Sequence, residues 1–168
     1  MKRIAAVCSV AVCSVALVVI MGVWFTHRAP ALSSATQHLY QTLKAKDVQA
    51  VSDALAQGAD VNAHDELGFT PLVWATINAG AVSGHPDTTD ALPLLLDKGA
   101  DINAPAVGNE TALIVAVKTN NSAAVKILLD RKADTSIKNV EGKTALAFAR
   151  GYRLSKIAAQ LEAAGAMQ

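Results

Sequence analysis

The stretch Leu95-Leu96-Asp97-Lys98-Gly99-Ala100-Asp101 decides the fold, because its last three residues and a second motif, Thr-Pro-Leu or Thr-Ala-Leu, recur together along the chain. The second motif occurs as Thr70-Pro71-Leu72, Thr111-Ala112-Leu113 and Thr144-Ala145-Leu146. The Gly-Ala-Asp motif also occurs as Gly58-Ala59-Asp60 and Lys132-Ala133-Asp134. For both motifs the later copies are 33 residues apart and the earlier ones 41. This shared period predicts a stack of repeats with an insertion in the second unit.

A 33-residue unit that begins with Thr-Pro-Leu and ends with Leu-Leu-x-x-Gly-Ala-Asp resembles the ankyrin repeat. The resemblance implies an all-α repeat fold, an ankyrin solenoid of about four helix-turn-helix units with short β-hairpin loops. The units are expected at about 35–64, 65–105, 106–138 and 139–168, with the first and last as caps.

The third unit illustrates the physical basis of this expectation. Leu113, Ile114 and Val117 are three or four residues apart, which predicts a helix starting at Thr111 with one buried stripe. Ser122 is the expected N-cap of the second helix. Asn109 stands where the family's turn glycine falls at Gly68 and Gly142, and Asn tolerates the positive φ of such a turn.

Two departures from the family pattern are clear. Val73, Ile114 and Ala147 replace the histidine that ties family repeats together, and proline is kept only at Pro71. We therefore expect a less stable stack than in a consensus array. Such relaxed motifs are typical of bacterial members of the family.

The first 31 residues are a separate segment. Of the 22 residues from Ile4 to Phe25, 19 are apolar and none is charged, a helix long enough to cross a membrane. Two interpretations stay open: an uncleaved membrane anchor, or a signal peptide cleaved near Ala31. Lys2 and Arg3 favour a cytoplasmic N-terminus, so both interpretations send residues 32–168 across the membrane. The expected location is the inner membrane with a periplasmic C-terminal domain, or the periplasm after cleavage.

Composition excludes several function classes. The 168 residues are 52% hydrophobic and 17% charged, and residues 32–168 contain 12 basic and 14 acidic residues. Nucleic acid is therefore not an expected partner, because no basic excess remains. Both cysteines lie within the apolar segment, and the four histidines show no metal-ligand spacing. We expect no enzymatic activity, metal, cofactor or small-molecule substrate.

Partner-binding residues are suggested by the family resemblance, which implies binding at hairpin tips and on the inner helices. At tip positions the candidates are His64, Glu66, Phe69, Val107, Glu110, Lys138, Val140 and Lys143. The inner-helix candidates are Trp74, Val115 and Phe148, which share one position in three successive units, and core packing is the alternative for all three. His85 lies in the insertion at 78–90, which is either a tolerated insertion or part of the binding site.

These observations predict a protein that binds another protein and is held at the membrane through residues 4–25. An immunity or accessory role towards a toxin or an envelope enzyme is an alternative within the same class. A hydrolase with an unrecognised site is the alternative from another class. The recurring Asp60, Asp101 and Asp134 are expected to support loops, not to bind metal.

Overall fold

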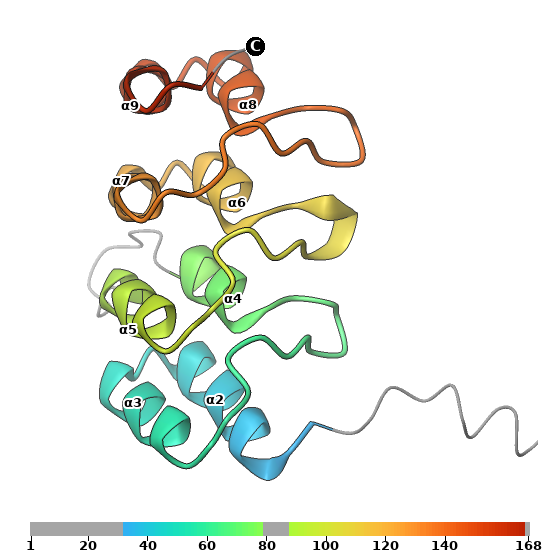
Figure 1. The fold of residues 1–168 in the computed structure, drawn as a ribbon, viewed down its shortest axis with the longest axis vertical. Coiled ribbons are helices and arrows are strands. Elements are labelled where there is room, and N and C mark those ends of the chain that lie inside the picture. Colours follow the sequence, from blue (N-terminus) through green and yellow to red (C-terminus); the bar gives the residue numbers. More distant parts are fainter. Residues whose placement is uncertain (1–31, 79–87, 167–168) are drawn as a thin grey trace, which may run out of the picture. The chain divides into compact units, whose positions relative to one another are not determined.

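The computed structural model describes residues 32–78 and 88–166 (Figure 1). The chain divides into two units, Met1–Ala31 and Leu32–Gln168, and the described residues all belong to the second. The predicted apolar segment 4–25 lies outside them, as does most of the predicted insertion, including His85. Within the two described ranges, no helix combines the length and the apolar character needed to cross a membrane.

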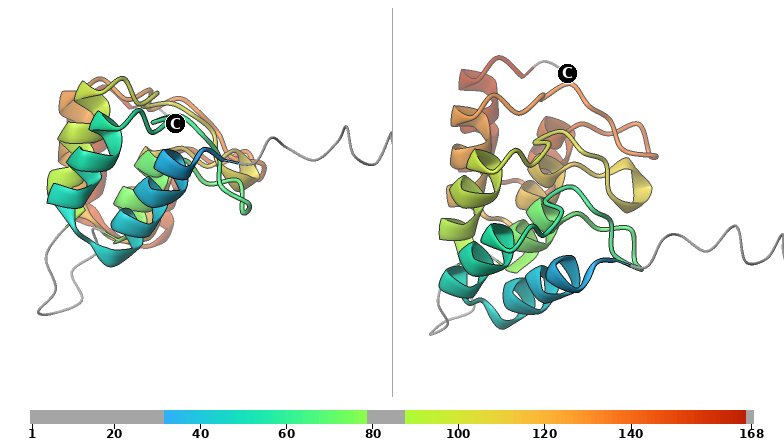
Figure 2. Two further views of the ribbon diagram at one scale, coloured as in Figure 1. Left: turned by 90° about the horizontal axis from the view of Figure 1, so that it is seen from below. Right: turned by 60° about the horizontal axis from the view of Figure 1, so that its bottom comes forward.

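The second unit is built from four helix pairs. They are α2 (Ser34–Ala45) with α3 (Val48–Ala56), α4 (Pro71–Asn78) with α5 (Ala91–Asp97), α6 (Ala112–Lys118) with α7 (Ser122–Asp130), and α8 (Ala145–Gly151) with α9 (Ser155–Ala163). Two short 3-10 turns, η1 (Thr88–Asp90) and η2 (Val107–Asn109), complete the elements. The first helices of the pairs form one column and the second helices another (Figures 1 and 2). Each pair lies within one of the four expected repeats.

The core runs between the two columns. Every residue of α6 from Ala112 to Val117 is buried because this helix packs between α4 and α8. Leu95, Leu128 and Leu161 close the core from the second helices. A single helix pair has no such neighbours, so the apolar faces are covered only when the pairs stack.

Threonine and asparagine side chains cap the N-termini of α6, α7 and α8. Thr111 and Thr144 precede α6 and α8, and their hydroxyls accept the N–H groups of Ile114 and Ala147. The prediction of Ser122 as an N-cap is wrong by one residue. Asn121 is the cap, because its side-chain oxygen accepts the Ala124 N–H at 2.9 Å, and Ser122 is already helical.

The loops between pairs correct the predicted β-hairpins. None of the described residues forms a strand. Each loop is a tight turn closed at its base by one N–H to C=O bond, which is too short a ladder for a strand. The three bonds join Asp65 to Phe69, Ala106 to Glu110, and Asn139 to Lys143, at 3.0, 2.9 and 3.0 Å. Asn109 has a φ of 57°, close to the 76° and 72° of Gly68 and Gly142, so the expected substitution of glycine by Asn109 is confirmed.

Candidate functional site

Three loops project from the same side of the stack, beside the column of first helices (Figures 1 and 2). We call residues 64–70, 105–111 and 138–144 the tip edge. Most of the predicted binding residues lie on it, namely His64, Glu66, Phe69, Val107, Glu110, Lys138, Val140 and Lys143. Trp74 lies next to it on α4, and His85 is outside the described residues. The structure therefore gathers the described candidates along one side of the stack.

Hydrogen bonds join each loop to the next. His64 Nε2 lies 3.2 Å from the carbonyl oxygen of Pro105. Asn109 Nδ2 donates to the carbonyl of Lys138 at 2.7 Å, and the Val140 N–H donates to the carbonyl of Gly108 at 2.9 Å. These bonds hold the three tips in a fixed register, so the edge is one structural feature.

Apolar side chains are exposed along this edge. Leu67, Val107 and Val140 are 61%, 56% and 76% exposed. The exposure expected for Val107 and Val140 is confirmed. Leu67 is absent from the predicted binding residues, although its place in the turn, next to Glu66, was the signal that could have found it. Exposed apolar groups in a row are a feature of protein-interaction surfaces.

Trp74 is held in place by polar contacts at its rim. Its indole N–H donates to Asp65 Oδ2 at 2.7 Å, and its ring meets Phe69 edge-on with centroids 5.8 Å apart. The Lys44 ammonium lies 5.0 Å from the ring centroid, which is within the range of a cation–π contact. Trp74 is half-buried, whereas Val115 and Phe148 are 6% exposed, in agreement with the core-packing alternative for these two.

The loop residue nine positions before Trp74, Val115 and Phe148 differs from repeat to repeat. Asp65 accepts the indole N–H of Trp74, whereas Asn139 occupies the same repeat position below Phe148, and Ala106 occupies it in the unit of Val115. In both loops the Oδ1 atom accepts two backbone N–H groups, those of Leu67 and Phe69 or those of Glu141 and Lys143. A carboxylate thus stands in the loop where the Trp74 indole N–H needs an acceptor, and an amide stands in the loop of Phe148, whose ring has no N–H to donate.

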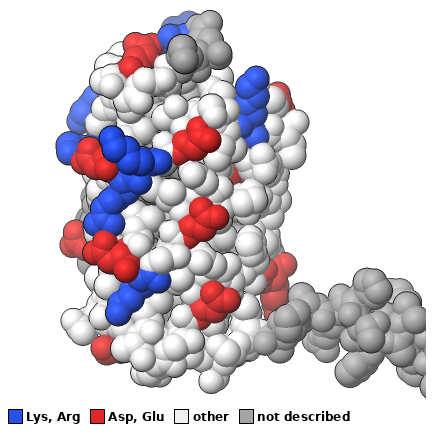
Figure 3. Space-filling model, viewed as in Figure 1, with Lys and Arg blue, Asp and Glu red and all other residues white. Residues whose placement is uncertain are grey.

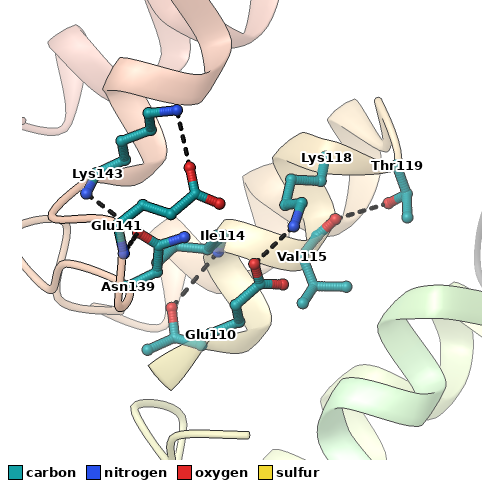
Figure 4. Close-up of polar contacts among 9 residues, drawn as sticks. Glu110, Ile114, Val115, Lys118, Thr119, Asn139, Glu141 and Lys143 are labelled. Carbon is teal, nitrogen blue, oxygen red and sulfur yellow. Dashed lines mark hydrogen bonds and ion pairs between the residues drawn. The ribbon is translucent and has the colours of Figure 1, made fainter. Parts of the chain in front are cut away.

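Two lysines lie near Phe148 at the other end of the face, and Figure 4 shows each of them beside a glutamate. Lys118 and Lys143 have their Nζ atoms 5.4 and 5.5 Å from the ring centroid. Glu110 pairs with Lys118 at 2.6 Å and Glu141 with Lys143 at 2.8 Å. The hydrogen bond between Glu141 and Lys143 raises the pKa of the lysine and lowers that of the glutamate. Two predicted residues, Glu110 and Lys143, therefore already have partners within the chain.

The recurring aspartates support loops, as expected. Asp60, Asp101 and Asp134 each accept the N–H two residues ahead, from Asn62, Asn103 and Ser136. The hydroxyl of Ser136 also donates to Asp134 and lowers the pKa of that carboxyl. Asn62 Oδ1 then accepts the Asp101 N–H of the next repeat, and Asn103 Oδ1 accepts that of Asp134. These asparagines form a ladder between repeats that the sequence motifs alone did not indicate.

No group of three or more His, Cys, Asp or Glu side chains in residues 32–78 and 88–166 is arranged to hold a metal ion.

Comparison with known proteins agrees with this architecture. Residues 95–149 match the family model described as ankyrin repeats (many copies). Residues 95–149 are therefore similar to ankyrin repeats. The chain is 32% identical to an ankyrin repeat protein of Acanthamoeba polyphaga mimivirus, over 62% of this chain and 63% of that protein. It is 26% identical to an ankyrin repeat domain-containing protein of Stachybotrys chartarum, over 53% of this chain and 6% of that protein.

A third similarity is to a protein with another name. The chain is 39% identical to the mitochondrial disaggregase of Bos taurus, over 42% of this chain and 9% of that protein. The chain thus spans less than two thirds of the length of each of these three relatives. Ankyrin repeats suggest a protein–protein interaction module.

Proposed function

We propose that this chain is a non-enzymatic module that binds another protein through the tip edge and the adjoining surface of α4. The observation that carries the proposal is the continuous row of exposed Leu67, Val107 and Val140, on three loops joined by hydrogen bonds. A surface that is fixed before binding loses little conformational entropy when a partner docks.

The polar groups near this surface support a binding role over a catalytic one. Asp65 is committed to Trp74, Glu110 to Lys118, and Glu141 to Lys143. A general base or nucleophile must instead reach a substrate atom. We expect these pairs to orient the loops and to set the charge around the apolar row.

We further propose display on the periplasmic side of a bacterial inner membrane. The support is the apolar segment 4–25 with Lys2 and Arg3 before it. Mass spectrometry of the mature N-terminus tests this directly: an intact Met1 in the membrane fraction indicates an anchor, and a start at Leu32 indicates cleavage. A reporter protein that is active only in the cytoplasm can also be fused to the C-terminus. Activity of this reporter would contradict periplasmic display. An immunity or accessory role towards a toxin or an envelope enzyme stays within this proposal as one class of partner.

The binding proposal is tested by affinity capture with two matched variants. Val140→Asp places a charge in the apolar row, and Ala123→Asp places the same charge on the exposed side of α7. Both positions are exposed, so both variants should fold, which circular dichroism can check. We expect the wild type and Ala123→Asp to capture the same protein and Val140→Asp to lose at least about 90% of it, as expected for a desolvated contact. Equal capture by both variants, or no captured protein above background, refutes the proposed face.

A further inference from the structure

We propose that the tip edge also docks onto a second copy of this chain, antiparallel to the first, about a twofold axis that passes through the middle tip. This inference rests on the proposed function, because it assigns an occupant to part of the same face. The argument comes from the order of charge and apolar surface along the edge, which is complementary to itself when reversed.

Two unpaired charges of opposite sign flank the apolar row. Glu66 lies on the first tip and Lys138 at the base of the third, and both side chains are exposed. Among the described residues, neither side chain has a hydrogen bond or an ion pair, whereas Glu110, Lys118, Glu141 and Lys143 all do. The two ends of the edge therefore present a free carboxylate and a free ammonium to a partner.

A twofold axis through the tip 105–111 brings unlike ends together. The antiparallel arrangement places Val107 opposite the partner's Val107. It also brings the first tip, with Glu66 and Leu67, against the partner's third tip, with Lys138 and Val140. The contact between the outer tips occurs twice, as isologous symmetry requires, and the contact of Val107 with its own copy lies on the axis. The register follows from the three tips being consecutive repeats, because reversing three equally spaced loops exchanges the outer two and keeps the middle one.

The charge of the whole stack favours the same orientation. Residues 35–105 contain 3 basic and 9 acidic residues, and residues 106–168 contain 9 basic and 5 acidic residues. Figure 3 shows the basic groups mainly along the side of the second helices and towards the C-terminal end, and none near the base in this view. Antiparallel association places the acidic half of one copy beside the basic half of the other, and parallel association would place like charges together.

Such an interface is expected to be weak and sensitive to salt. Three loop tips offer less than the roughly 800 Å² per partner of a standard interface. Exposed ion pairs are screened when the ionic strength rises. The hydrogen bonds between tips offset part of this weakness, because the edge is already ordered before it docks.

Site-directed cross-linking of the full chain tests the twofold register. In a background with Cys8→Ala and Cys13→Ala, Val107→Cys should form a covalent dimer with a short bis-maleimide, since residue 107 lies opposite itself. Ala123→Cys, exposed on α7, is the matched control and should remain monomeric. Equal cross-linking of both cysteines, or none at position 107, overturns the proposal.

Charge exchange then tests the pairing of the ends. We expect Glu66→Lys and Lys138→Glu each to lower the cross-linked fraction at least about fivefold, because each replaces two attractive pairs by two repulsive ones. The double variant, or an equal mixture of the two single variants, should restore it to within about twofold. Asp53→Lys and Lys156→Glu, on exposed sites of α3 and α9, control for the charge of each half of the stack and should lower the cross-linked fraction less than about twofold.

The results separate this inference from the proposed function. Single exchanges without effect, or a double variant that does not recover, overturn the antiparallel dimer. If the dimer fails while Val140→Asp still loses a captured protein that Ala123→Asp retains, the edge binds a different protein. If both experiments fail, the edge is not a binding surface.

Discussion

Removing the hydroxyl of Tyr40 should loosen the first loop of the tip edge. Tyr40 lies on α2 and is 4% exposed. Its hydroxyl is 2.8 Å from the carbonyl oxygens of Ala63 and Phe69, which bracket the first tip. Tyr40→Phe keeps the ring in the core and removes only this connection between the first helix and the first tip.

The expected loss of stability follows from the two acceptors. One hydroxyl proton is shared between two carbonyls, and the net value of a hydrogen bond is about 0.5–1.5 kcal/mol. The Phe69 carbonyl keeps the N–H of Asp65, whereas no second donor to the Ala63 carbonyl is seen in the described part of the chain. We therefore expect Tyr40→Phe to lower the free energy of unfolding by about 1.5 kcal/mol, slightly above a single bond.

Urea denaturation followed by circular dichroism measures this change. Tyr152→Phe is the matched control, because Tyr152 is 52% exposed and its hydroxyl has no hydrogen bond within the described residues. The control should change stability by less than about 0.5 kcal/mol. A Tyr40→Phe variant within about 0.3 kcal/mol of the wild type would show that water replaces the hydroxyl and that the reasoning is wrong.

The same side chain predicts a pH dependence. Burial, with smaller contributions from the nearby Asp65 and Asp60 carboxylates, raises the pKa of Tyr40 well above its usual 10.0. The unfolded chain loses this proton above pH 10 while the folded chain retains it, so stability falls by about 1.4 kcal/mol per pH unit there. The advantage of the wild type over Tyr40→Phe should be constant up to about pH 9 and close to zero near pH 11. A difference that does not shrink between these values contradicts the assignment.

Three further predictions concern the ladder, the inner aromatic and the turn glycines. The Asn62 side chain makes two hydrogen bonds to the next repeat and the Asn103 side chain makes one. In urea denaturation, Asn62→Ala should lower the free energy of unfolding by about 1 kcal/mol and Asn103→Ala by about half as much. Equal losses would contradict this difference in hydrogen bonds. Asp65→Asn turns an amide N–H towards the Trp74 indole N–H and should lower the free energy of unfolding by about 1–2 kcal/mol. Adding Trp74→Phe should recover most of this loss. Additive effects of the two substitutions would contradict the pairing. Gly68→Ala and Gly142→Ala both place a Cβ at positive φ, which should lower the free energy of unfolding by about 1 kcal/mol each. Only the Cβ at position 68 meets another side chain, Val107 Cγ2 at 3.0 Å, so Gly68→Ala should lower the melting temperature further. A larger fall for Gly142→Ala would refute the contact.

The sequence was most informative where one residue's own chemistry fixes its conformation. Asn109 adopts the positive φ expected of its turn, and α6 begins directly after Thr111, where the apolar spacing placed its start, because both are local properties of the side chains. The stack followed from the period, since an apolar stripe on each short helix needs a neighbour to cover it.

Contacts across repeats were beyond the sequence. Nothing in the chain order relates Tyr40 to Phe69, or Asn62 to Asp101, because these pairs depend on how one helix pair is placed on the next. The sequence assigned most candidate residues to loops that the structure places along one edge, but it did not indicate which of their side chains stay free. Glu110 and Lys143 proved to be paired, and Leu67 proved to be exposed.

The side chains that hydrogen-bond from one repeat to the next differ along the stack, and this limits how the chain could have gained repeats. Tyr40, Asn62 and His64 bond across the seam between the first and second repeats. Asn103 bonds across the second seam, and the Val140 N–H bonds to Gly108 across the third. A duplicated unit inserted at any seam would meet a neighbour whose donors and acceptors are set for a different unit. Each of the four repeats therefore fits only its own neighbours. Adding or reordering repeats would require matching substitutions in both repeats at every new interface.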